Sequence, residues 1–444
     1  MPTKLHIHGG APLNGTIAVD SSKNALLPII AATILTRGVT VLKNVPRISD
    51  IDNLLHILIA LNIRPTWRDG DLVIDTTDIT YNEITSATAA KIRGSIFVLG
   101  AILGRFRTAS VPYPGGCAIG SRPIDLHLQG LRDLGVRVIE KNGVITCKKT
   151  NTRKEVFLDF PSVGATENLI LASVLGKTRT IIHGAAREPE VVDLCNFLNA
   201  AGAAICGHGT STITIQGVPA LAGTTYTAIP DRIITGSYLI AAATCGGKVT
   251  LTNTIAAHNE NLIDKLRKAG CGIHINSDKI TITTGPPFTK GVPAIRGRGF
   301  LRALGTVHTA PYPGFPTDLQ SQLAVLQTIS RGTTHITENL FENRFRYVPE
   351  LKKLGAKICV TRDKSITIKG VKSLTAAHFS VNNSSLGATQ LHATDLRGGV
   401  ALVIAALAAP GSSVIHNAEY IYRGHAAIER DLASLGANII RTDD

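Results

Sequence analysis

The sequence predicts an α/β protein made of six copies of one β-α-β-α-β-β unit, divided between two similar domains in which sheets enclose helices. Three observations lead to this prediction. An almost wholly apolar helix pattern recurs six times. Each copy is followed by a β-branched strand and by an amphipathic helix that ends near Leu-Gly or Ala-Gly. Successive units are spaced by roughly 67 to 85 residues, much longer than a solenoid repeat.

The six apolar helices are predicted from stretches that are hydrophobic on every side, as is typical of fully buried helices. They are Asn24–Thr36, Gly94–Gly104, Ala165–Gly176, Arg232–Cys245, Leu319–Ser330 and Gly398–Ala409. The amphipathic helices carry polar residues on one face, which predicts that this face meets solvent. Examples are Asp50–Leu61, Pro123–Leu134 and Asn261–Ala269. A buried and an exposed helix in each unit, joined by alternating strands such as Val39–Leu42, imply helices surrounded by sheets.

The last unit lacks the return strand of its hairpin, and the N-terminal segment resembles the missing strand. Lys4–Gly9 has the same pattern as the return strand Ile213–Gly217. We therefore expect residues 1–22 to pair with residues 231–444 in a discontinuous domain of three repeats. The other three repeats form a domain of residues 23–230. A crevice between two similar halves is a favoured ligand site.

Composition and charge restrict the class of protein. The chain has 444 residues, of which 44% are hydrophobic and 18% charged, so it is neither disordered nor a coiled coil. Lys and Arg outnumber Asp and Glu by 46 to 32, and this net charge of +14 attracts nucleic acid, anionic lipid or phosphorylated small molecules. The cations are spread along the chain and only 5% of residues are aromatic, which favours a small polyanion.

Apolar stretches and cysteines indicate the compartment. The runs Ala25–Leu35 and Val400–Ala409 are shorter than the ~18 residues of a membrane span. The N-terminal residues lack the apolar region of a signal peptide. We therefore expect a cytoplasmic protein with no membrane partner. The seven cysteines stand singly and without a C-x-x-C pattern, which predicts neither a disulfide framework nor a zinc ribbon.

Polar residues at the starts of the apolar helices are the first candidates for a ligand site. In chain order they are Lys23 and Asn24, Arg93, Ser162 with Val163 and Gly164, Asp231, Thr317 and Asp318, and Asp395 with Arg397. Helix N-termini that converge on one crevice would bind an anion. The alternative for the Asn, Ser, Thr and Asp residues, Asp318 included, is that they are ordinary N-caps.

Capping does not explain the cations Lys23, Arg93 and Arg397. A cation beside a helix N-terminus is electrostatically unfavourable unless an anion lies between them, so these residues favour a bound anion. For a lone arginine, a solvated helix face is the alternative.

The glycine-rich stretch Val111–His127 is the second candidate. It predicts an exposed loop and then a helix that opens at Pro123, with Arg122 directly before it. Cys117 lies in this loop and is a candidate acid or nucleophile, because a helix N-terminus and an arginine perturb a thiol pKa. A lone cysteine is otherwise usually a small buried hydrophobe. His127 is either a site residue or an ordinary histidine on a helix face.

Seven motifs in order resemble the UDP-N-acetylglucosamine 1-carboxyvinyltransferase family. They are Ser22–Ile29, Pro114–His127, Ser162–Thr166, Ala186–Glu190, Phe315–Asp318, Phe341–Phe345 and Ala393–Arg397, and the resemblance runs from about Ile7 to Arg441. It implies the two-domain inside-out α/β barrel of the enolpyruvyl transferases. It also implies transfer of enolpyruvyl from phosphoenolpyruvate to the 3′-hydroxyl of UDP-N-acetylglucosamine, with release of phosphate, at the first committed step of peptidoglycan precursor synthesis.

The resemblance also implies roles for individual residues. It assigns phosphoenolpyruvate to Lys23, Arg122 and Arg397, with Arg423 close by. It assigns the nucleotide sugar to Asn24, Arg93, Arg122, Pro123, Ile124, Asp125, Leu126, Ser162, Val163, Gly164, Asp318 and Leu340.

The catalytic roles follow from the same resemblance. Asp318 matches the base that takes the 3′-hydroxyl proton, and Cys117 matches the general acid that protonates C3. A thiol with an ordinary pKa of ~8.5 is mostly protonated at neutral pH and can act as an acid. The epoxide antibiotic fosfomycin is expected to alkylate Cys117. The resemblance implies no cofactor, no metal and no nucleic-acid partner.

Two departures from the family pattern and two alternatives remain. Phe160 and Pro161 precede Ser162 where some relatives have a lysine, and Tyr422 precedes Arg423 where an acidic residue is common. One alternative is an enzyme like 3-phosphoshikimate 1-carboxyvinyltransferase, although the Gly115–Gly120 loop resembles the UDP-sugar branch. The other, from a different class, is a basic RNA-end-binding protein of similar repeat architecture.

Overall fold

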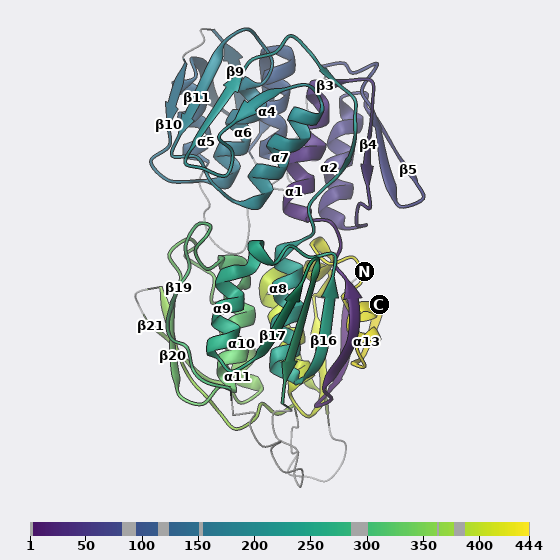
Figure 1. Ribbon diagram of the computed structural model, residues 1–444, viewed down its shortest axis with the longest axis vertical. Coiled ribbons are helices and arrows are strands. Elements are labelled where there is room, and N and C mark those ends of the chain that lie inside the picture. The colour runs from purple at the N-terminus through teal and green to yellow at the C-terminus, as the bar shows by residue number, and fades with distance from the viewer. Residues whose placement is uncertain are drawn as a thin grey trace. The chain divides into compact units, whose positions relative to one another are not determined.

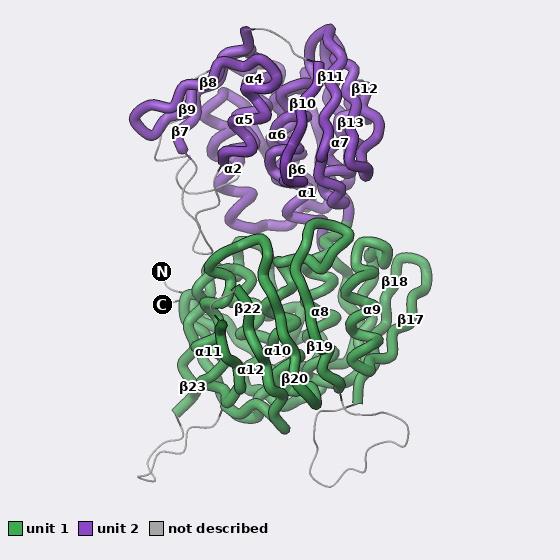
Figure 2. Tube along the Cα trace, turned by 90° about the vertical axis from the view of Figure 1, so that its left-hand side faces the viewer, with its two compact units in different colours: residues 1–19, 118–120, 230–444 green, residues 20–117, 121–229 purple. Residues whose placement is uncertain are grey.

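The computed structural model describes residues 3–81, 95–113, 124–150, 154–285, 301–361, 364–376 and 387–443. Among these residues, contacts divide the chain into two compact units (Figure 2). Unit 1 contains the N-terminal segment up to Val19 and the chain from Pro230 onward, and unit 2 runs from Asp20 to Ile229. In each unit, several β-sheets are arranged around a group of helices (Figure 1).

Unit 2 contains helices from three successive repeats. They are α1 (Lys23–Ala32), α2 (Ser49–Ala60), α4 (Ser95–Phe106), α5 (Asp125–Asp133), α6 (Val163–Ser173) and α7 (Pro189–Ala200), with the 3-10 helix η1 (Thr33–Leu35) after α1. The strands are β3 (Thr36–Arg37), β4 (Val39–Lys43), β5 (Arg64–Arg68), β6 (Asp71–Asp75), β7 (Thr108–Pro112), β8 (Val136–Lys141), β9 (Val144–Lys149), β10 (Glu155–Phe157), β11 (Arg179–His183), β12 (Ala204–Cys206), β13 (Thr212–Gln216), β14 (Leu221–Ala222) and β15 (Thr225–Thr227). They form the sheets β15-β4-β6-β5, β7-β9-β8 and β10-β11-β13-β12 and the pair β14-β3.

Unit 1 repeats the same plan. Its helices are α8 (Arg232–Cys245), η2 (Ala256–Asn259), α9 (Glu260–Lys268), η3 (Thr317–Leu319), α10 (Gln320–Thr328), α11 (Val348–Lys353), α12 (Leu396–Ala408), η4 (Ala418–Arg423) and α13 (Ile428–Ser434). Its strands are β1 (Thr3–Gly9), β2 (Leu13–Ala18), β16 (Gly247–Thr252), β17 (Gly272–Asn276), β18 (Lys279–Thr284), β19 (Gly305–His308), β20 (Thr333–Thr337), β21 (Lys357–Thr361), β22 (Ser365–Lys369), β23 (Thr389–His392), β24 (Gly411–His416) and β25 (Asn438–Asp443). They form the sheets β17-β18-β16-β2, β19-β20-β22-β21 and β23-β24-β1-β25.

The N-terminal strand completes the last sheet. β1 lies between β24 and β25 and is antiparallel to both, so that Leu5 is opposite Ile415 on one side and Arg441 on the other. It takes the central position that β18 and β22 hold in the other two sheets of unit 1. The strand pairing predicted from the resemblance of Lys4–Gly9 to Ile213–Gly217 is therefore confirmed.

The apolar helices form the interior, as their sequences predict. All residues of α8 are buried, and α8, α10 and α12 contact one another. In unit 2, α4 contacts both α1 and α6. A side chain at Gly236 of α8 would collide with the Leu319 side chain, so this glycine lets α8 approach η3 closely. The packing of α8 thus supports the turn that carries Asp318.

Two apolar helices are each three residues shorter than their sequences predict. The helix expected to reach Thr36 ends at Ala32, because the Thr33 hydroxyl donates to Ile30 O at 2.7 Å and the chain tightens into η1. The helix expected to begin at Leu319 begins at Gln320, and Leu319 belongs to η3. Hydroxyl bonds and 3-10 turns of this kind leave no mark on hydrophobic periodicity.

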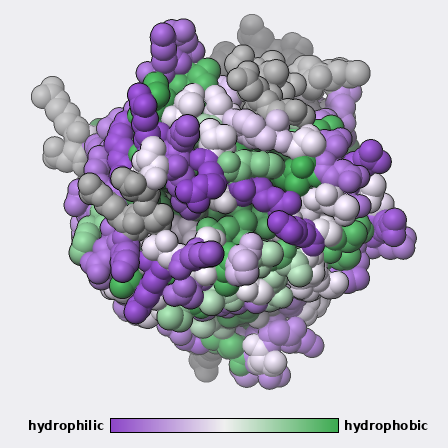
Figure 3. All heavy atoms as spheres, turned by 90° about the horizontal axis from the view of Figure 1, so that it is seen from above, coloured by the Kyte–Doolittle hydropathy of each residue, from purple (hydrophilic) through white to green (hydrophobic). Residues whose placement is uncertain are grey.

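The surface is mixed in character. On the face shown in Figure 3, hydrophobic side chains lie singly or in small groups among hydrophilic ones. The amphipathic helix α9 buries Leu262, Ile263 and Leu266 and exposes its charged residues, as predicted. Within the described ranges, every helix is too short or too polar to cross a membrane.

Asp193 provides a test of the packing of unit 2. Its buried carboxylate accepts a hydrogen bond from the Tyr226 hydroxyl at 2.6 Å and one from Ile229 N at 3.0 Å. Burial raises the pKa of Asp193 to about 6 against these two bonds. Since the folded state holds the proton more tightly than the unfolded state, the free energy of unfolding should decrease by about 1 kcal/mol per unit as pH rises from about 4 to about 6.

Denaturant unfolding at several pH values measures this slope. The slope of the variant Asp193→Asn should be smaller by about this amount, because residue 193 then has no proton to release. Equal slopes for the wild-type protein and the variant would contradict the prediction.

Candidate functional site

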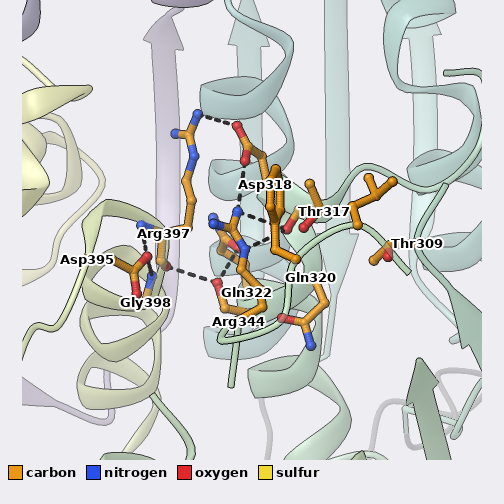
Figure 4. Close-up of polar contacts among 12 residues, drawn as sticks. Thr309, Thr317, Asp318, Gln320, Gln322, Arg344, Asp395, Arg397 and Gly398 are labelled. Atoms are coloured by element: carbon orange, nitrogen blue, oxygen red, sulfur yellow. Dashed lines mark hydrogen bonds and ion pairs between the residues drawn. The ribbon is translucent and has the colours of Figure 1, made fainter. Parts of the chain in front are cut away.

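The centre of the candidate site in unit 1 is the carboxylate of Asp318, which is held between two arginines (Figure 4). Its Oδ1 lies 2.8 Å from Nη2 of Arg344, and its Oδ2 lies 2.7 Å from Nη2 of Arg397. The arginine side chains are 3% and 7% exposed, whereas the Asp318 side chain is 27% exposed. Two nearly buried cations therefore favour the ionised carboxylate, and part of that carboxylate still reaches solvent.

Backbone contacts orient the two arginines. Arg344 donates from Nη2 and Nε to the carbonyl of Thr317, at 3.1 and 3.4 Å. Arg397 lies in the first turn of α12, where Asp395 Oδ1 accepts its backbone N–H at 3.0 Å. The Ser321 hydroxyl at the start of α10 donates to the Arg397 carbonyl at 3.0 Å. The N-terminal ends of α10 and α12 are thus tied together beside Asp318 (Figure 4).

Asp318 is not a helix cap, and the N-cap interpretation of this residue is wrong. The N-cap position of α10 is Leu319, which makes no side-chain capping bond. Because the chain enters α10 through η3, the Asp318 carboxylate faces the arginines instead of the helix N–H groups. The interpretation is also wrong for Asn24 and Thr317, because the N-cap of α1 is Ser22 and that of η3 is Pro316. It is confirmed for Ser162, Asp231 and Asp395, which accept backbone N–H bonds in the first turns of α6, α8 and α12.

Lys23 has a carboxylate partner in unit 2. It is the first residue of α1, and its Nζ lies 2.7 Å from Oδ2 of Asp50 on α2, with both side chains at most 10% exposed. Asn24 follows it and is half-buried. The anion that a cation beside a helix N-terminus requires is therefore supplied by the protein at Lys23, as it is at Arg397.

His127 connects the beginnings of α5 and α6. Its Nδ1 lies 3.1 Å from Nδ2 of Asn168, and that amide nitrogen also donates to Ile96 O at 3.0 Å. Since an amide nitrogen can only donate, Nδ1 accepts and the ring hydrogen is on Nε2. Gly164 lies directly against this ring. The His127 ring thus connects two segments that the sequence analysis predicted as ligand contacts. They are Ile124, Asp125 and Leu126 at the start of α5, and Ser162, Val163 and Gly164 at the start of α6.

Glu167 is a buried acid that the sequence analysis did not single out. It is 1% exposed, and neither carboxyl oxygen has a hydrogen-bond partner. Burial, together with the nearby charges of Glu190 and Glu188, raises its pKa well above the ordinary value. Burial thus favours the protonated form of Glu167, which lies four residues after Val163.

Two further predicted residues, Leu340 and Arg423, belong to unit 1, and four lie outside the described residues. Leu340 is half-buried, and its backbone N–H donates to Glu338 at 2.9 Å. Arg423 is the last residue of η4, and the preceding Tyr422 donates its hydroxyl to Glu429 at 2.8 Å. The candidates outside the described residues are Arg93, Cys117, Arg122 and Pro123.

Two of the described cysteines are exposed. Cys206 and Cys359 are exposed free thiols. Burial raises the pKa values of Cys147, Cys245 and Cys271 to about 12. A reactive Cys117 must therefore owe its selectivity to charge and ligand proximity.

Sequence reasoning assigned no role to three residues that organise these clusters. Arg344 lies inside the Phe341–Phe345 motif, so it was visible but unassigned. Asp50 begins an amphipathic stretch, and Glu338 directly follows a strand. Their signal was present only as polar residues next to predicted elements, and their partners Asp318, Lys23 and Thr317 are 26, 27 and 21 residues away in the sequence.

Comparisons with known proteins cover nearly the whole chain. A family model described as EPSP synthase (3-phosphoshikimate 1-carboxyvinyltransferase) matches residues 7–432. UDP-N-acetylglucosamine 1-carboxyvinyltransferase 2 of Caldanaerobacter subterraneus subsp. tengcongensis is 44% identical over 439 residues, which cover 99% of each chain. UDP-N-acetylglucosamine 1-carboxyvinyltransferase of Cellvibrio japonicus is 42% identical over 442 residues, again 99% of each chain.

Solved structures share the fold. The enolpyruvyl transferase NikO from Streptomyces tendae superimposes with a TM-score of 0.83 at 24% identity, covering 99% of both chains. EPSP synthase from Acinetobacter baumannii gives a TM-score of 0.71 at 16% identity, covering 99% of this chain and 100% of that one. The two-domain α/β architecture expected from the sequence is therefore that of known enolpyruvyl transferases.

Gly164 provides a test of the contact between α5 and α6. A Cβ atom at this position would lie 2.9 Å from Cε1 and 3.1 Å from Nε2 of His127. Because His127 is fixed by Asn168, Gly164→Ala should lower the free energy of unfolding by about 1–3 kcal/mol. Gly387→Ala is the matched control, since nothing lies within 4 Å of a Cβ there. Equal stabilities of the two variants in urea would contradict the assigned contact.

Proposed function

The chain belongs to the UDP-N-acetylglucosamine 1-carboxyvinyltransferases, within the enolpyruvyl transferase family, and we propose on this premise that it transfers enolpyruvyl from phosphoenolpyruvate to the 3′-hydroxyl of UDP-N-acetylglucosamine. Phosphate is released, and the product enters peptidoglycan precursor synthesis. The observation that carries the proposal is 40–44% identity over 99% of the chain to relatives named for this reaction. The 3-phosphoshikimate alternative has only the family description and fold-level likeness on its side.

The proposed phosphoenolpyruvate ligands are cationic side chains. They are Lys23, Arg122, Arg397 and Arg423. Phosphoenolpyruvate carries a phosphate and a carboxylate, and arginine binds such groups with its fork of N–H donors. Asp318 occupies Nη2 of Arg397, and the guanidinium has further donors for an anion. Lys23 and Arg397 are both nearly buried, which strengthens their attraction for an anion.

The nucleotide sugar is proposed to contact residues near the starts of the buried helices. In unit 2 these are Asn24, Arg93, Arg122, Pro123, Ile124, Asp125, Leu126, Ser162, Val163 and Gly164, and in unit 1 they are Asp318 and Leu340. The N-terminus of α6 suits a diphosphate, because its N–H groups and dipole favour negative charge. One of these N–H groups, that of Ala165, already donates to the capping Ser162 hydroxyl.

The proposed chemistry is addition followed by elimination. The Asp318 carboxylate takes the proton of the sugar 3′-hydroxyl as its oxygen bonds to C2 of phosphoenolpyruvate, and Cys117 gives its thiol proton to C3. A tetrahedral intermediate results, which carries both the sugar oxygen and the phosphate oxygen on C2. A proton then returns from C3 to the Cys117 thiolate left by the first step, and the C2–O bond to phosphate breaks, which gives the enolpyruvyl ether and inorganic phosphate. Arg344 keeps Asp318 ionised, as a base must be.

We further propose that the partners are small molecules in the cytoplasm. The net charge of +14 would then attract the phosphates of both substrates, with no nucleic-acid or membrane partner. Phosphate release from phosphoenolpyruvate, measured with UDP-N-acetylglucosamine or with shikimate 3-phosphate as acceptor, tests the proposed function directly. Release that depends on shikimate 3-phosphate alone would overturn it.

Asp318→Asn tests the proposed base. The variant cannot accept the hydroxyl proton, so kcat should fall by ~10²–10⁴-fold. Because two nearly buried arginines also lose their counter-charge, we expect lower stability, and circular dichroism must show that the assayed protein is folded. Near-normal kcat in folded protein would exclude Asp318 as the base.

Fosfomycin tests the role of Cys117. The phosphonate should concentrate the epoxide at the cationic residues, so that the Cys117 sulfur alone is alkylated. Cys117→Asp keeps a proton donor without a nucleophilic sulfur, so it should retain some transfer and resist the drug. Cys117→Ser should turn over poorly.

Peptide mass mapping after fosfomycin treatment identifies the modified residue. The exposed thiols Cys206 and Cys359 are internal controls for exposure without a ligand site. An adduct on either of them, with Cys117 unmodified, would contradict the assignment.

A further inference from the structure

Glu338 is a fully buried carboxylate with no place in the proposed chemistry. It directly follows β20 and is 0% exposed. Its Oε1 accepts hydrogen bonds from the Thr309 hydroxyl at 2.9 Å, Leu340 N at 2.9 Å and Phe341 N at 3.2 Å. Its Oε2 accepts one from the Thr317 hydroxyl at 2.8 Å. All four of these donors are uncharged groups, and together they satisfy the carboxylate. A buried charge is costly unless it has such partners.

The four donors come from separate segments of the chain. Thr309 follows β19, Thr317 begins η3, and Leu340 and Phe341 lie in the loop after β20. Thr309 strengthens the junction further, because its hydroxyl accepts from Asn339 N and its carbonyl accepts from Asn339 Nδ2, both at 2.9 Å. One carboxylate therefore joins three loops of unit 1.

Two of these donors lie at the proposed binding site of the acceptor sugar. Thr317 precedes the proposed base Asp318, and Leu340 is itself a proposed contact of the nucleotide sugar. Thr317 is fixed on both sides, since its hydroxyl donates to Glu338 and its carbonyl accepts from Arg344. Hydrogen bonds to a charged group are the stronger class, so they suit the task of fixing a loop.

We propose that Glu338 is the positioning residue for the acceptor sugar. It sets the place of Asp318 through the Thr317 hydroxyl and the place of Leu340 through its backbone N–H. This inference rests on the proposed function. Glu338 does not touch the reacting atoms; it determines where the base and one sugar contact lie when UDP-N-acetylglucosamine binds.

A matched pair of threonine variants separates positioning from general support. Thr317→Val and Thr309→Val each remove one hydroxyl donor from Glu338 and conserve shape, and Thr309→Val also removes the acceptor of Asn339 N. Only Thr317 adjoins the base, so Thr317→Val should lower kcat by about 10-fold or more, whereas Thr309→Val should keep kcat within about 3-fold. Equal kcat values for the two variants would overturn the proposal.

Variants of Glu338 test the effect on each substrate. Glu338→Ala should lower kcat/KM for UDP-N-acetylglucosamine by about 10²-fold and change the KM for phosphoenolpyruvate by less than about 3-fold. Glu338→Gln should recover most of the loss, because its carbonyl oxygen keeps the Oε1 bonds and the Thr317 hydroxyl can accept from its amide. A rise in the KM for phosphoenolpyruvate as large as that for UDP-N-acetylglucosamine would contradict a positioning role. No recovery of kcat/KM in Glu338→Gln would also contradict it.

The wild-type protein keeps the two proposals distinguishable. Enolpyruvyl transfer to UDP-N-acetylglucosamine by the wild type tests the function, and the variants are then scored only relative to it. If Glu338→Ala does not fold, the threonine pair decides. Calorimetric titration of each folded variant with UDP-N-acetylglucosamine should show weaker binding for Glu338→Ala than for Glu338→Gln, and unchanged affinities would overturn the inference.

Discussion

The arrangement around Asp318 depends on one requirement, that a charge removed from water must find a partner. Arg344 and Arg397 are nearly buried, and the carboxylate between them is what allows both to remain there. The starts of α10 and α12 meet at this point, because the Ser321 hydroxyl binds the Arg397 carbonyl. Removing Asp318 would leave two cations without a counter-charge, so the same residue serves the fold and the proposed chemistry.

Two cations at the helix starts already have anionic partners within the protein. Their presence beside positive helix ends suggests a bound anion from sequence alone. Asp50 and Asp318 already supply negative charge to Lys23 and Arg397. At the proposed ligands, a substrate anion would share each cation with a protein carboxylate, which weakens its binding and favours its release. Each proposed turnover leaves a phosphate ion that must dissociate. A site whose cations are partly neutralised by carboxylates favours this dissociation.

The fold was largely predictable from sequence, and the site only in part. Buried helices such as Arg232–Cys245 follow from apolar periodicity, and the pairing of β1 follows from its likeness to other return strands. The turn that removes Leu319 from α10 depends on a 3-10 geometry that periodicity does not encode. The roles of Arg344 and Glu338 depend on partners brought together by tertiary structure, and a single sequence does not reveal such pairs.

The position of β1 has a consequence for the order in which the chain can fold during synthesis. All strands of unit 2 lie between residues 36 and 227, so its sheets can close once that length has left the ribosome. The last sheet of unit 1 needs β1, made first, between β24 and β25, made last. Until then the earliest strand has two unpaired edges, which are a template for unwanted association. One face of β1 is polar before the sheet closes, because it carries the alternating residues Lys4, His6 and His8.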